Sequence, residues 1–577
     1  MNTAKRIFLS LSVFLTLLFG ATIARAQDQP IEAEAPIEPA VAEEAAAEAA
    51  GEEGIEGSPA VAPAARAKGS RGGKRTRFAG GKKRRAAKRR GGDPRPNIVT
   101  IMVDDQAMNT WSKRFMPRTF RYLVRQGTRI KDGGYAVPPL CCPSRAGFQT
   151  GQYPHNHQVY NNNPGFGAFA DPSNQIASWL RGAGYRTGFV GKYMNGFDRR
   201  RPVAGYDYWW AILGKPHYEN YRASEQGGPK RRYRGKRNYV TNRITAKSRR
   251  FIRRSAKRNK PFFLWTSHYA PHPRRSNDKF CGRGAPSPLK RDWKKRFRRL
   301  PLPKSPNFNE RDISDKPEIV RAPRLRRGKV RKIVKHYRCA VATLQAVDRS
   351  VAQIVRELRR AGELKNTIIV YVSDNGYYFG EHRSVRGKIR PWEEALRVPF
   401  AIRAPRKALG AKPVSRLGEM VATIDLAPTF LELAEAEPCM PGTGRCRTMD
   451  GRSLVGILSG DHSQWPENRE LVLQIANACY HGYRAIRDER YLYVEWAKGP
   501  KDGNCHFGGA ELYDLEADPY QLENLIGPAT VPPRFLGDIL PPEISEVAER
   551  YAERLEELHG CNGIAGRDEE SGQPLCG

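Results

Sequence analysis

Residues 97–105 have the sequence Asn-Ile-Val-Thr-Ile-Met-Val-Asp-Asp, a short apolar run that is rich in β-branched residues and ends in two acids. A continuous apolar run of this length predicts a strand that is buried on both faces. Such strands are typical of parallel sheets whose faces are covered by helices. We therefore expect residues 97–103 to form a central strand, with Asp104 and Asp105 at its carboxyl end.

Further strands and helices are predicted along the chain. The clearest amphipathic helix covers about Val330–Leu358, where apolar residues recur at spacings of three and four. Alternation of strands with helices predicts an α/β sheet that is covered on both faces. Beyond about residue 460 the strands become shorter and cysteines more frequent, which we interpret as a small C-terminal subdomain. The other predicted strands are Tyr185–Val190, Phe262–Thr266, Thr367–Val372 and Val398–Ile402.

Polar side chains follow two of these strands. Asp104 and Asp105 follow the first, and Asp374 and Asn375 follow the strand at Thr367–Val372. Ligands of open α/β sheets gather at the carboxyl ends of strands. Three carboxylates and one amide oxygen suit a hard cation such as Ca²⁺ or Mg²⁺. The alternative interpretation is that both pairs are ordinary turns.

The most informative stretch is Cys141-Cys142-Pro143-Ser144-Arg145-Ala-Gly-Phe-Gln-Thr150-Gly151. It resembles the signature of the type I, formylglycine-dependent sulfatases, Cys-x-Pro-Ser-Arg followed by Thr-Gly. In that family a formylglycine-generating enzyme oxidises the first cysteine to formylglycine. The resemblance makes Cys141 the modified residue and Cys142 the variable one. The alternative is a structural cysteine pair in front of a helix.

The chemistry of this motif can be followed from its residues. Pro143 suits the first turn of a helix, whose free amides together with Arg145 would face an anion. A formylglycine hydrate has two hydroxyls, of which one attacks sulfur and the other then loses its proton, so that C=O re-forms and sulfate leaves. A serine would remain as its sulfate ester, whereas the second hydroxyl of the aldehyde hydrate allows the ester to collapse and release sulfate.

Other segments fall where the resemblance would place them, over roughly residues 96–526. Gly191-Lys192 resembles the segment whose lysine binds sulfate, and Ala270-Pro271-His272 the segment whose histidine faces the leaving oxygen. Lys388 resembles the late active-site lysine. The resemblance implies that Arg145 steadies the hydrate, that Lys192 and Lys388 neutralise sulfate, and that His272 protonates the leaving alcohol. It implies a metal held by Asp104, Asp105, Asp374, Asn375 and the hydrate oxygen of residue 141.

One position departs from the pattern. Many sulfatases have a histidine two residues after the lysine, where this chain has Met194 followed by Asn195. The branch of N-acetylglucosamine-6-sulfatases and heparan endosulfatases is similar in this respect. Asn195 is then expected to bind sulfate or substrate, and His272 to be the acid or base. His155 and His157 follow the signature and are expected either to line the substrate pocket or to form a structural turn.

The resemblance implies an alkaline-phosphatase-like sandwich, in which a large mixed central sheet is flanked by helices, with a small C-terminal α+β subdomain. We expect the catalytic domain at residues 94–460 and the subdomain at 461–577. Residues 273–331 are rich in Arg, Lys and Pro and predict a long basic excursion of the kind that builds binding walls.

The N-terminus predicts export. Lys5 and Arg6 precede an apolar run, and Ala24-Arg25-Ala26 is a small-x-small cleavage site, so residues 1–26 are expected to be a signal peptide. Residues 27–93 are first acidic and then basic and predict a disordered linker. We expect a secreted protein, extracellular or periplasmic, or lysosomal in a eukaryote, with no transmembrane segment after cleavage. Export permits disulfides among the ten cysteines, and short spacings favour Cys439–Cys446, Cys479–Cys505 and Cys561–Cys576.

The formal net charge of +39 lies mostly beyond residue 93. A basic body attracts polyanions. The basic block at residues 66–90 could bind nucleic acid, but the signal peptide argues against the nucleus. We therefore expect a sulfated carbohydrate as substrate, such as a glycosaminoglycan with N-acetylglucosamine-6-sulfate, and no specific nucleic acid. Two alternatives remain, a phosphodiesterase or phosphonate hydrolase on the same scaffold, and a non-catalytic polyanion-binding protein.

Overall fold

The computed structural model describes residues 93–199, 201–214, 216–273, 281, 296–475, 482–498, 506–529, 531–532, 539–568 and 573–576. The expected signal peptide, the expected linker up to residue 92 and the expected pair Cys479–Cys505 lie outside these residues. No helix in the described ranges is long and apolar enough to span a membrane.

A ten-stranded mixed sheet forms the centre of the fold, with the strand order β12-β2-β11-β9-β1-β8-β4-β5-β6-β7. Its middle strands β9, β1, β8, β4 and β5 run parallel, and β11, β6 and β7 are antiparallel to their neighbours. Four of the five predicted strands are present as single strands, and the fifth, Val398–Ile402, is divided at Pro399 between the separate strand β10 and β11 of the large sheet. The strands are β1 Asn97–Asp104, β2 Thr128–Ile130, β4 Arg186–Lys192, β5 Tyr208–Leu213, β6 Asn220–Glu225, β7 Arg231–Arg234, β8 Phe262–Pro271, β9 Thr367–Ser373, β11 Phe400–Arg403 and β12 Arg416–Leu417; β3 Gly134–Tyr135 and β10 Arg397–Val398 pair separately.

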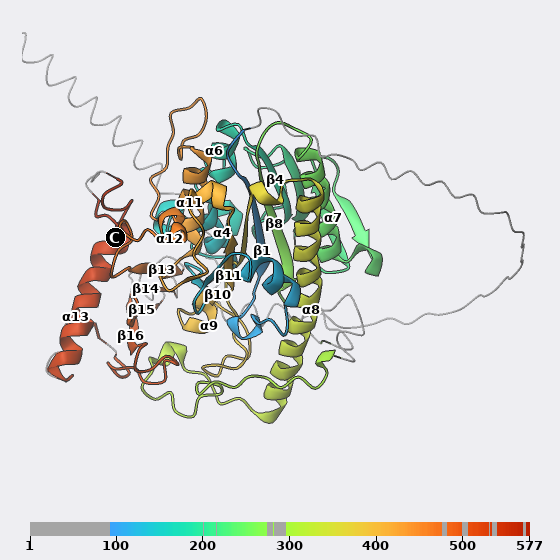
Figure 1. Ribbon diagram of the computed structural model, residues 1–577. Helices are drawn as coiled ribbons and strands as arrows, with labels where there is room; N and C mark the ends of the chain where they lie inside the picture. The colour runs from blue at the N-terminus through green and yellow to red at the C-terminus, as the bar shows by residue number, and fades with distance from the viewer. Residues whose placement is uncertain are drawn as a thin grey trace, which may run out of the picture. The chain divides into compact units, whose positions relative to one another are not determined.

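Helices cover both faces of the sheet (Figure 1). Strand β1 explains why, because its side chains alternate between two cores: Val99 and Ile101 face one, and Ile98 and Met102 face the other. The first core is closed by α7 (Val240–Ser255) and α8 (Arg327–Arg360). The second is closed by α4 (Cys141–Thr150), α6 (Ile176–Gly182) and α11 (Leu426–Ala434). The predicted helix at 330–358 is the central part of α8.

The C-terminal part has a sheet of its own. Strands β13 (Leu471–Ile475), β14 (Tyr483–Arg487), β15 (Tyr491–Lys498) and β16 (His506–Asp514) are antiparallel and follow one another in order. Helix α13 (Pro542–Glu557) packs on β14 and β15, and both contribute to a third core. The expected small C-terminal α+β part is therefore confirmed. The short helices are α3 Pro117–Thr119, α5 Pro154–His157, α9 Glu393–Leu396, α10 Arg406–Leu409 and α12 Val455–Ser459.

Three disulfides join described cysteines. Cys439–Cys446 and Cys561–Cys576 are formed, as their spacing predicts. The third, Cys281–Cys339, has a sequence separation of 58 and was not predicted, because so long a separation gives no local signal. It attaches the basic excursion to α8. Cys141 and Cys142 are buried, and neither forms a disulfide with another described cysteine.

Candidate active site

The acidic pairs meet at the carboxyl ends of two neighbouring parallel strands. Val103 of β1 is in register with Ser373 of β9, so the residues that follow them adjoin. The Asp105 amide donates to Asp374 Oδ1 at 3.3 Å, and Asn375 Nδ2 donates to Asp105 Oδ1 at 2.7 Å. Asp105 has a φ of 63°, a left-handed conformation that Asp tolerates better than most residues. The register of the sheet thus assembles the predicted acid set.

Helix α4 begins at Cys141 and points its first turn at these acids. Cys141 Sγ lies 3.5 Å from Asp104 Oδ1 and 4.0 Å from Asp105 Oδ1. The side chain is buried, and burial raises the pKa of the thiol well above its usual value. The next residue, Cys142, has its amide held by Asn162 Oδ1 at 3.0 Å. This contact partly satisfies the first turn of the helix and fixes its direction.

Arg145 lies one turn further along α4 and is completely buried. Its Nε donates to Asp374 Oδ2 at 2.7 Å, and its Nη1 donates to Ser267 Oγ at 2.8 Å and to the Lys192 carbonyl at 2.7 Å. A guanidinium offers several donors in a fixed plane, so one side chain links α4 to the ends of β4, β8 and β9. Arg145 Nη2 also lies 3.8 Å from Asp104 Oδ2.

Two lysines and one histidine lie against the acids. Lys192 Nζ lies 2.5 Å from Asp104 Oδ2, and Lys388 Nζ lies 2.8 Å from Asp105 Oδ1. His272 Nε2 lies 3.6 Å from Asp105 Oδ2. Burial opposes ionisation of Asp104, but Lys192 and His272 outweigh it and lower the pKa of that carboxyl. Burial and the charge of Asp104 raise the pKa of Asp374.

The donor set fits a divalent cation. Ligand atoms of Asp104, Asp105, Cys141 and His272 all lie within 4.8 Å of one another. Asn375 Oδ1 is buried and accepts no hydrogen bond from the described chain, and a buried oxygen without a donor is costly unless something else satisfies it. Oxygen ligands of this kind suit Ca²⁺ or Mg²⁺.

His272 is oriented by its neighbours. Its Nδ1 donates to the Pro273 carbonyl at 2.5 Å, which leaves Nε2 facing the acids. The ring stacks on Tyr269 with 4.8 Å between centroids, and the Tyr218 hydroxyl donates to the His272 carbonyl at 2.8 Å. The sequence analysis missed both tyrosines, because nothing in their spacing distinguishes them from core aromatics.

Two of the three candidate substrate residues, His155 and His157, lie away from the acid cluster. His155 bonds to Gln474 Oε1 at 2.8 Å and to the Cys561 carbonyl at 2.7 Å. His157 is buried and accepts from the Val159 amide, and burial lowers its pKa to about 3. Within the described chain, no hydrogen bond or ion pair joins either histidine to the acid cluster. The reason is that α5 packs against β13 and the C-terminal segment.

Asn195 lies nearer to the signature. Its amide donates to Cys142 Sγ at 3.0 Å, and its carbonyl accepts from the Phe166 amide at 2.9 Å. Its backbone therefore contacts the second cysteine of the motif.

A second buried network holds the loop that carries Lys388. His382 Nδ1 lies 3.0 Å from Glu310 Oε2, and His382 Nε2 lies 3.6 Å from Glu394 Oε2. Burial lowers the pKa of His382, but hydrogen bonds to Glu310 and Glu394 outweigh this and raise it to about 9. Glu310 belongs to the basic excursion, so the excursion packs beneath the Lys388 loop. The sequence analysis did not identify this network.

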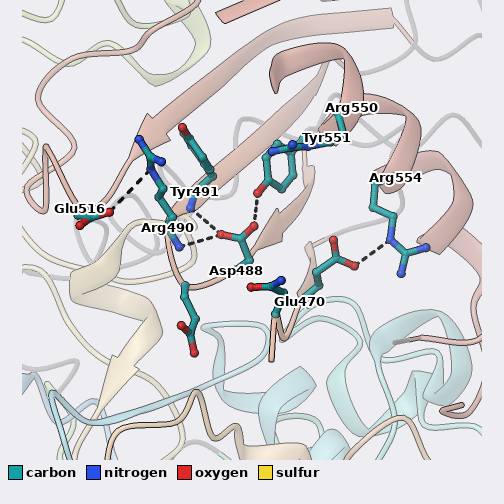
Figure 2. Close-up of a pocket in the computed structure, with 10 residues that line it drawn as sticks. Glu470, Asp488, Arg490, Tyr491, Glu516, Arg550, Tyr551 and Arg554 are labelled. Atoms are coloured by element: carbon teal, nitrogen blue, oxygen red, sulfur yellow. Dashed lines mark hydrogen bonds and ion pairs between the residues drawn. The ribbon is translucent and has the colours of Figure 1, made fainter. Parts of the chain in front are cut away.

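The acid cluster is distinct from the pocket drawn in Figure 2. That pocket, of about 810 Å³, lies in the C-terminal part between the β14–β15 turn and α13. Several of its charges are paired with one another, since Arg490 lies 3.9 Å from Glu516 and Arg554 lies 2.8 Å from Glu470. The lining residues are Asn468, Glu470, Asp488, Glu489, Arg490, Tyr491, Glu516, Arg550, Tyr551 and Arg554, and none of them is a predicted site residue.

Comparison with known proteins gives consistent matches. The family model described as Sulfatase matches residues 96–436, and the one described as N-sulphoglucosamine sulphohydrolase, C-terminal, matches residues 380–533. The N-acetylglucosamine-6-sulfatase of Capra hircus is 31% identical over 77% of this chain and 82% of its own length. The extracellular sulfatase SULF-1 homolog of Drosophila melanogaster is 32% identical over 67% of this chain.

This chain matches only part of some relatives. It spans 34% of the length of the Drosophila protein and 50% of the putative extracellular sulfatase Sulf-1 homolog of Caenorhabditis elegans. Among solved structures, a protein in complex with its substrate D-glucosamine-2-N,6-O-disulfate matches with a TM-score of 0.62 and 24% identity, over 80% of this chain and 97% of that one. The fold is therefore the alkaline-phosphatase-like sandwich that the sequence predicts.

Proposed function

The chain belongs to the sulfatase family, and on that premise we propose that it hydrolyses sulfate esters of a carbohydrate at the cluster around Cys141. One observation carries the proposal. The Cys141 side chain lies between the carboxylates of Asp104 and Asp105, and those carboxylates bind the ammonium groups of Lys192 and Lys388. The proposed nucleophile thus lies next to carboxylates that are suited to a divalent cation and next to two lysines that are suited to an anionic substrate.

The nucleophile in this proposal is the hydrate of a formylglycine at position 141, which a formylglycine-generating enzyme makes from the cysteine. One hydroxyl oxygen forms a bond to sulfur while the bond from sulfur to the sugar oxygen breaks. The second hydroxyl then gives up its proton, the carbonyl re-forms, and sulfate departs. Water restores the hydrate. This order lets the covalent intermediate collapse without a second attack at sulfur.

Asp104, Asp105, Asp374 and Asn375 would hold Ca²⁺ or Mg²⁺. The bound ion would polarise the sulfate oxygens and lower the pKa of the attacking hydroxyl. Arg145 holds Asp374 in place and closes the inner side of the site.

Two kinds of side chain act on the substrate. Lys192 and Lys388, which bind Asp104 and Asp105, would offset the charge of the sulfate group. His272 delivers a proton to the leaving sugar oxygen from Nε2, because Nδ1 donates to the Pro273 carbonyl and is thereby fixed. Sugar alkoxides are poor leaving groups, so this proton matters most for carbohydrate esters.

The substrate class we propose is a sulfated glycosaminoglycan that carries glucosamine 6-sulfate. Support comes from the relatives named N-acetylglucosamine-6-sulfatase and from the neighbour whose substrate is a disulfated glucosamine. The strongly basic body is suited to such a polyanion. We further propose that the protein acts outside the cytoplasm, as the name of the extracellular relatives suggests.

Mass spectrometry of the peptide that contains Cys141, combined with kinetics, tests this proposal. We expect formylglycine at position 141 and release of sulfate from glucosamine 6-sulfate, both lost in Cys141→Ala. Cys142→Ala is the matched control and is expected to retain both, since its Sγ contacts only the Asn195 amide among the hydrogen bonds of the described chain. An unmodified thiol in protein from a host that matures sulfatases, or faster turnover of phosphate esters than of sulfate esters, would contradict the proposal.

A further inference from the structure

The hairpin formed by β6 and β7 carries a cluster of exposed basic side chains at the edge of the large sheet. β7 is the last strand in the order, so one side of it has no neighbouring strand among the described residues. Within the part of the chain that the structure describes, Lys230, just before β7, is the one member of this cluster that is paired with an acid, at 2.8 Å from Asp198. The others form no ion pair within the described chain. We call Arg222, Arg232, Arg234, Lys236 and Arg237 the β6–β7 basic surface.

Two of these arginines face each other directly. Arg222 and Arg232 are cross-strand partners in the antiparallel pair. Like charges at directly opposite positions destabilise a sheet. The only polar contact of this pair within the described chain is from Arg232 Nε to Asn220 Oδ1 at 3.2 Å, and it brings no negative charge. An anion bound between the two guanidinium groups would remove this repulsion.

The surface lies on the side of the sheet that carries the nucleophile. Tyr221 and Ala223 pack into the core under α7 and α8. Because side chains alternate along a strand, Arg222, Arg232 and Arg234 point to the opposite face, the one covered by α4. Helix α4 begins with Cys141.

The sheet register gives the separation from the candidate site. Lys192 at the end of β4 pairs with Ile212 of β5, the next residue Leu213 pairs with Arg222, and Arg222 pairs with Arg232. At about 4.8 Å for each step between strands, Arg222 lies two steps, about 10 Å, and Arg232 three steps, about 14 Å, from Lys192 across the sheet. These are distances that a few linked sugar rings cover.

The connection from β5 to β6, which leads into this hairpin, contacts His272 directly. Tyr218, in the turn that leads into β6, donates its hydroxyl to the His272 carbonyl at 2.8 Å. Its ring lies 5.0 Å from that of Tyr269, on which His272 stacks. A glycan chain that leaves the site past His272 would therefore meet the start of the hairpin.

We propose that the β6–β7 basic surface is a second binding site for the anionic glycan, which holds sulfate or carboxylate groups of the same chain a few sugars away from the ester that is cleaved. The inference rests on the proposed function. The use of arginine at these positions favours glycan binding over simple protection of an edge strand, because one guanidinium group can donate hydrogen bonds to two sulfate oxygens at once. Edge protection requires charge alone.

The test compares a long and a small substrate. The variant Arg222→Gln/Arg232→Gln/Arg234→Gln is measured for heparin affinity at several salt concentrations, and for kcat/KM on a heparin oligosaccharide and on 4-nitrophenyl sulfate. Three lost contacts at an exposed surface are expected to weaken heparin binding and kcat/KM on the oligosaccharide roughly tenfold. Turnover of the aryl sulfate, which is too small to reach the surface, is expected to stay unchanged.

The matched control removes three basic charges at the opposite end of the sheet. These residues are exposed and precede β9, so they lie at the amino ends of the strands. The control changes are Arg356→Gln, Arg360→Gln and Lys365→Gln, and they are expected to alter heparin affinity less than twofold.

The outcomes separate this inference from the proposed function. If the hairpin and control variants bind heparin equally, the arginines protect the edge only and the inference is wrong. If no version of the protein hydrolyses either sulfate ester, the proposed function fails, while heparin affinity still tests the surface. If the Gln variant aggregates, the corresponding Lys variant retains the edge charge and is expected to lose roughly threefold in affinity, because ammonium groups do not bind in pairs.

Discussion

Replacement of Arg145 by methionine tests how the site is held together. The side chain is completely buried, its Nε donates to Asp374 Oδ2 at 2.7 Å, and its Nη1 donates to Ser267 and to the Lys192 carbonyl. Methionine preserves much of the volume but removes every one of these contacts. Asp374 would then be buried next to Asp104 without its nearest cation.

The cost follows from that arrangement. Breaking a buried ion pair by removal of one partner costs about 3–5 kcal/mol, because the remaining charge is left uncompensated. At roughly 2 °C per kcal/mol for a large domain, the melting temperature is expected to fall by roughly 6–10 °C. Melting is followed by circular dichroism in the presence of a chelator, so that no metal takes over the role of the guanidinium.

Two further variants make the reasoning refutable. Addition of Asp374→Asn to Arg145→Met removes the uncompensated charge and is expected to recover a large part of the lost stability. Such non-additive effects show that the two sites are coupled, because the effects of independent sites add. Arg490→Met breaks an exposed pair with Asp514 and is expected to cost at most about 1 kcal/mol. A melting temperature within about 1 °C of the parent for Arg145→Met, or additive effects in the double variant, would refute the argument.

Three other outcomes are expected. His272→Gln should lower kcat on a sugar sulfate by about 10²–10⁴ but have much less effect on 4-nitrophenyl sulfate, whose phenolate leaves without a proton; equal losses on both would exclude a proton-donor role. Ca²⁺ at about 100 times its Kd should stabilise the protein by about 2.7 kcal/mol in thermal melts, and Asp105→Asn should abolish this shift. The pKa of His382 is raised to about 9, so the stability that its protonated form contributes is fully present below pH ~6.5 and is lost as the pH rises through 9. His382→Gln should therefore reduce the fall in the free energy of unfolding between these pH values, as measured by urea unfolding. A pH profile of the variant that matches the parent's would contradict the assignment.

The sequence by itself determined the elements and the composition of the candidate site. Asn97–Asp104 had to be a doubly buried strand, because a continuous β-branched run has no polar face to expose to water. The acids and Arg145 could be named in advance, since they follow strands or lie within a recognisable motif. These signals lie within short stretches of sequence, so they can be recognised before the fold is known.

Only the tertiary structure decided which residues meet. His155 and His157 follow the motif closely in sequence, yet His155 bonds to Gln474 in the C-terminal part and the buried His157 packs against Phe169. Conversely, Asn162 and Tyr218 contact the site without any sequence signal, because their roles depend on packing between distant segments. Contacts of this kind arise from sheet register and helix packing, and these are set by the summed burial of the whole core rather than by any short stretch of chain.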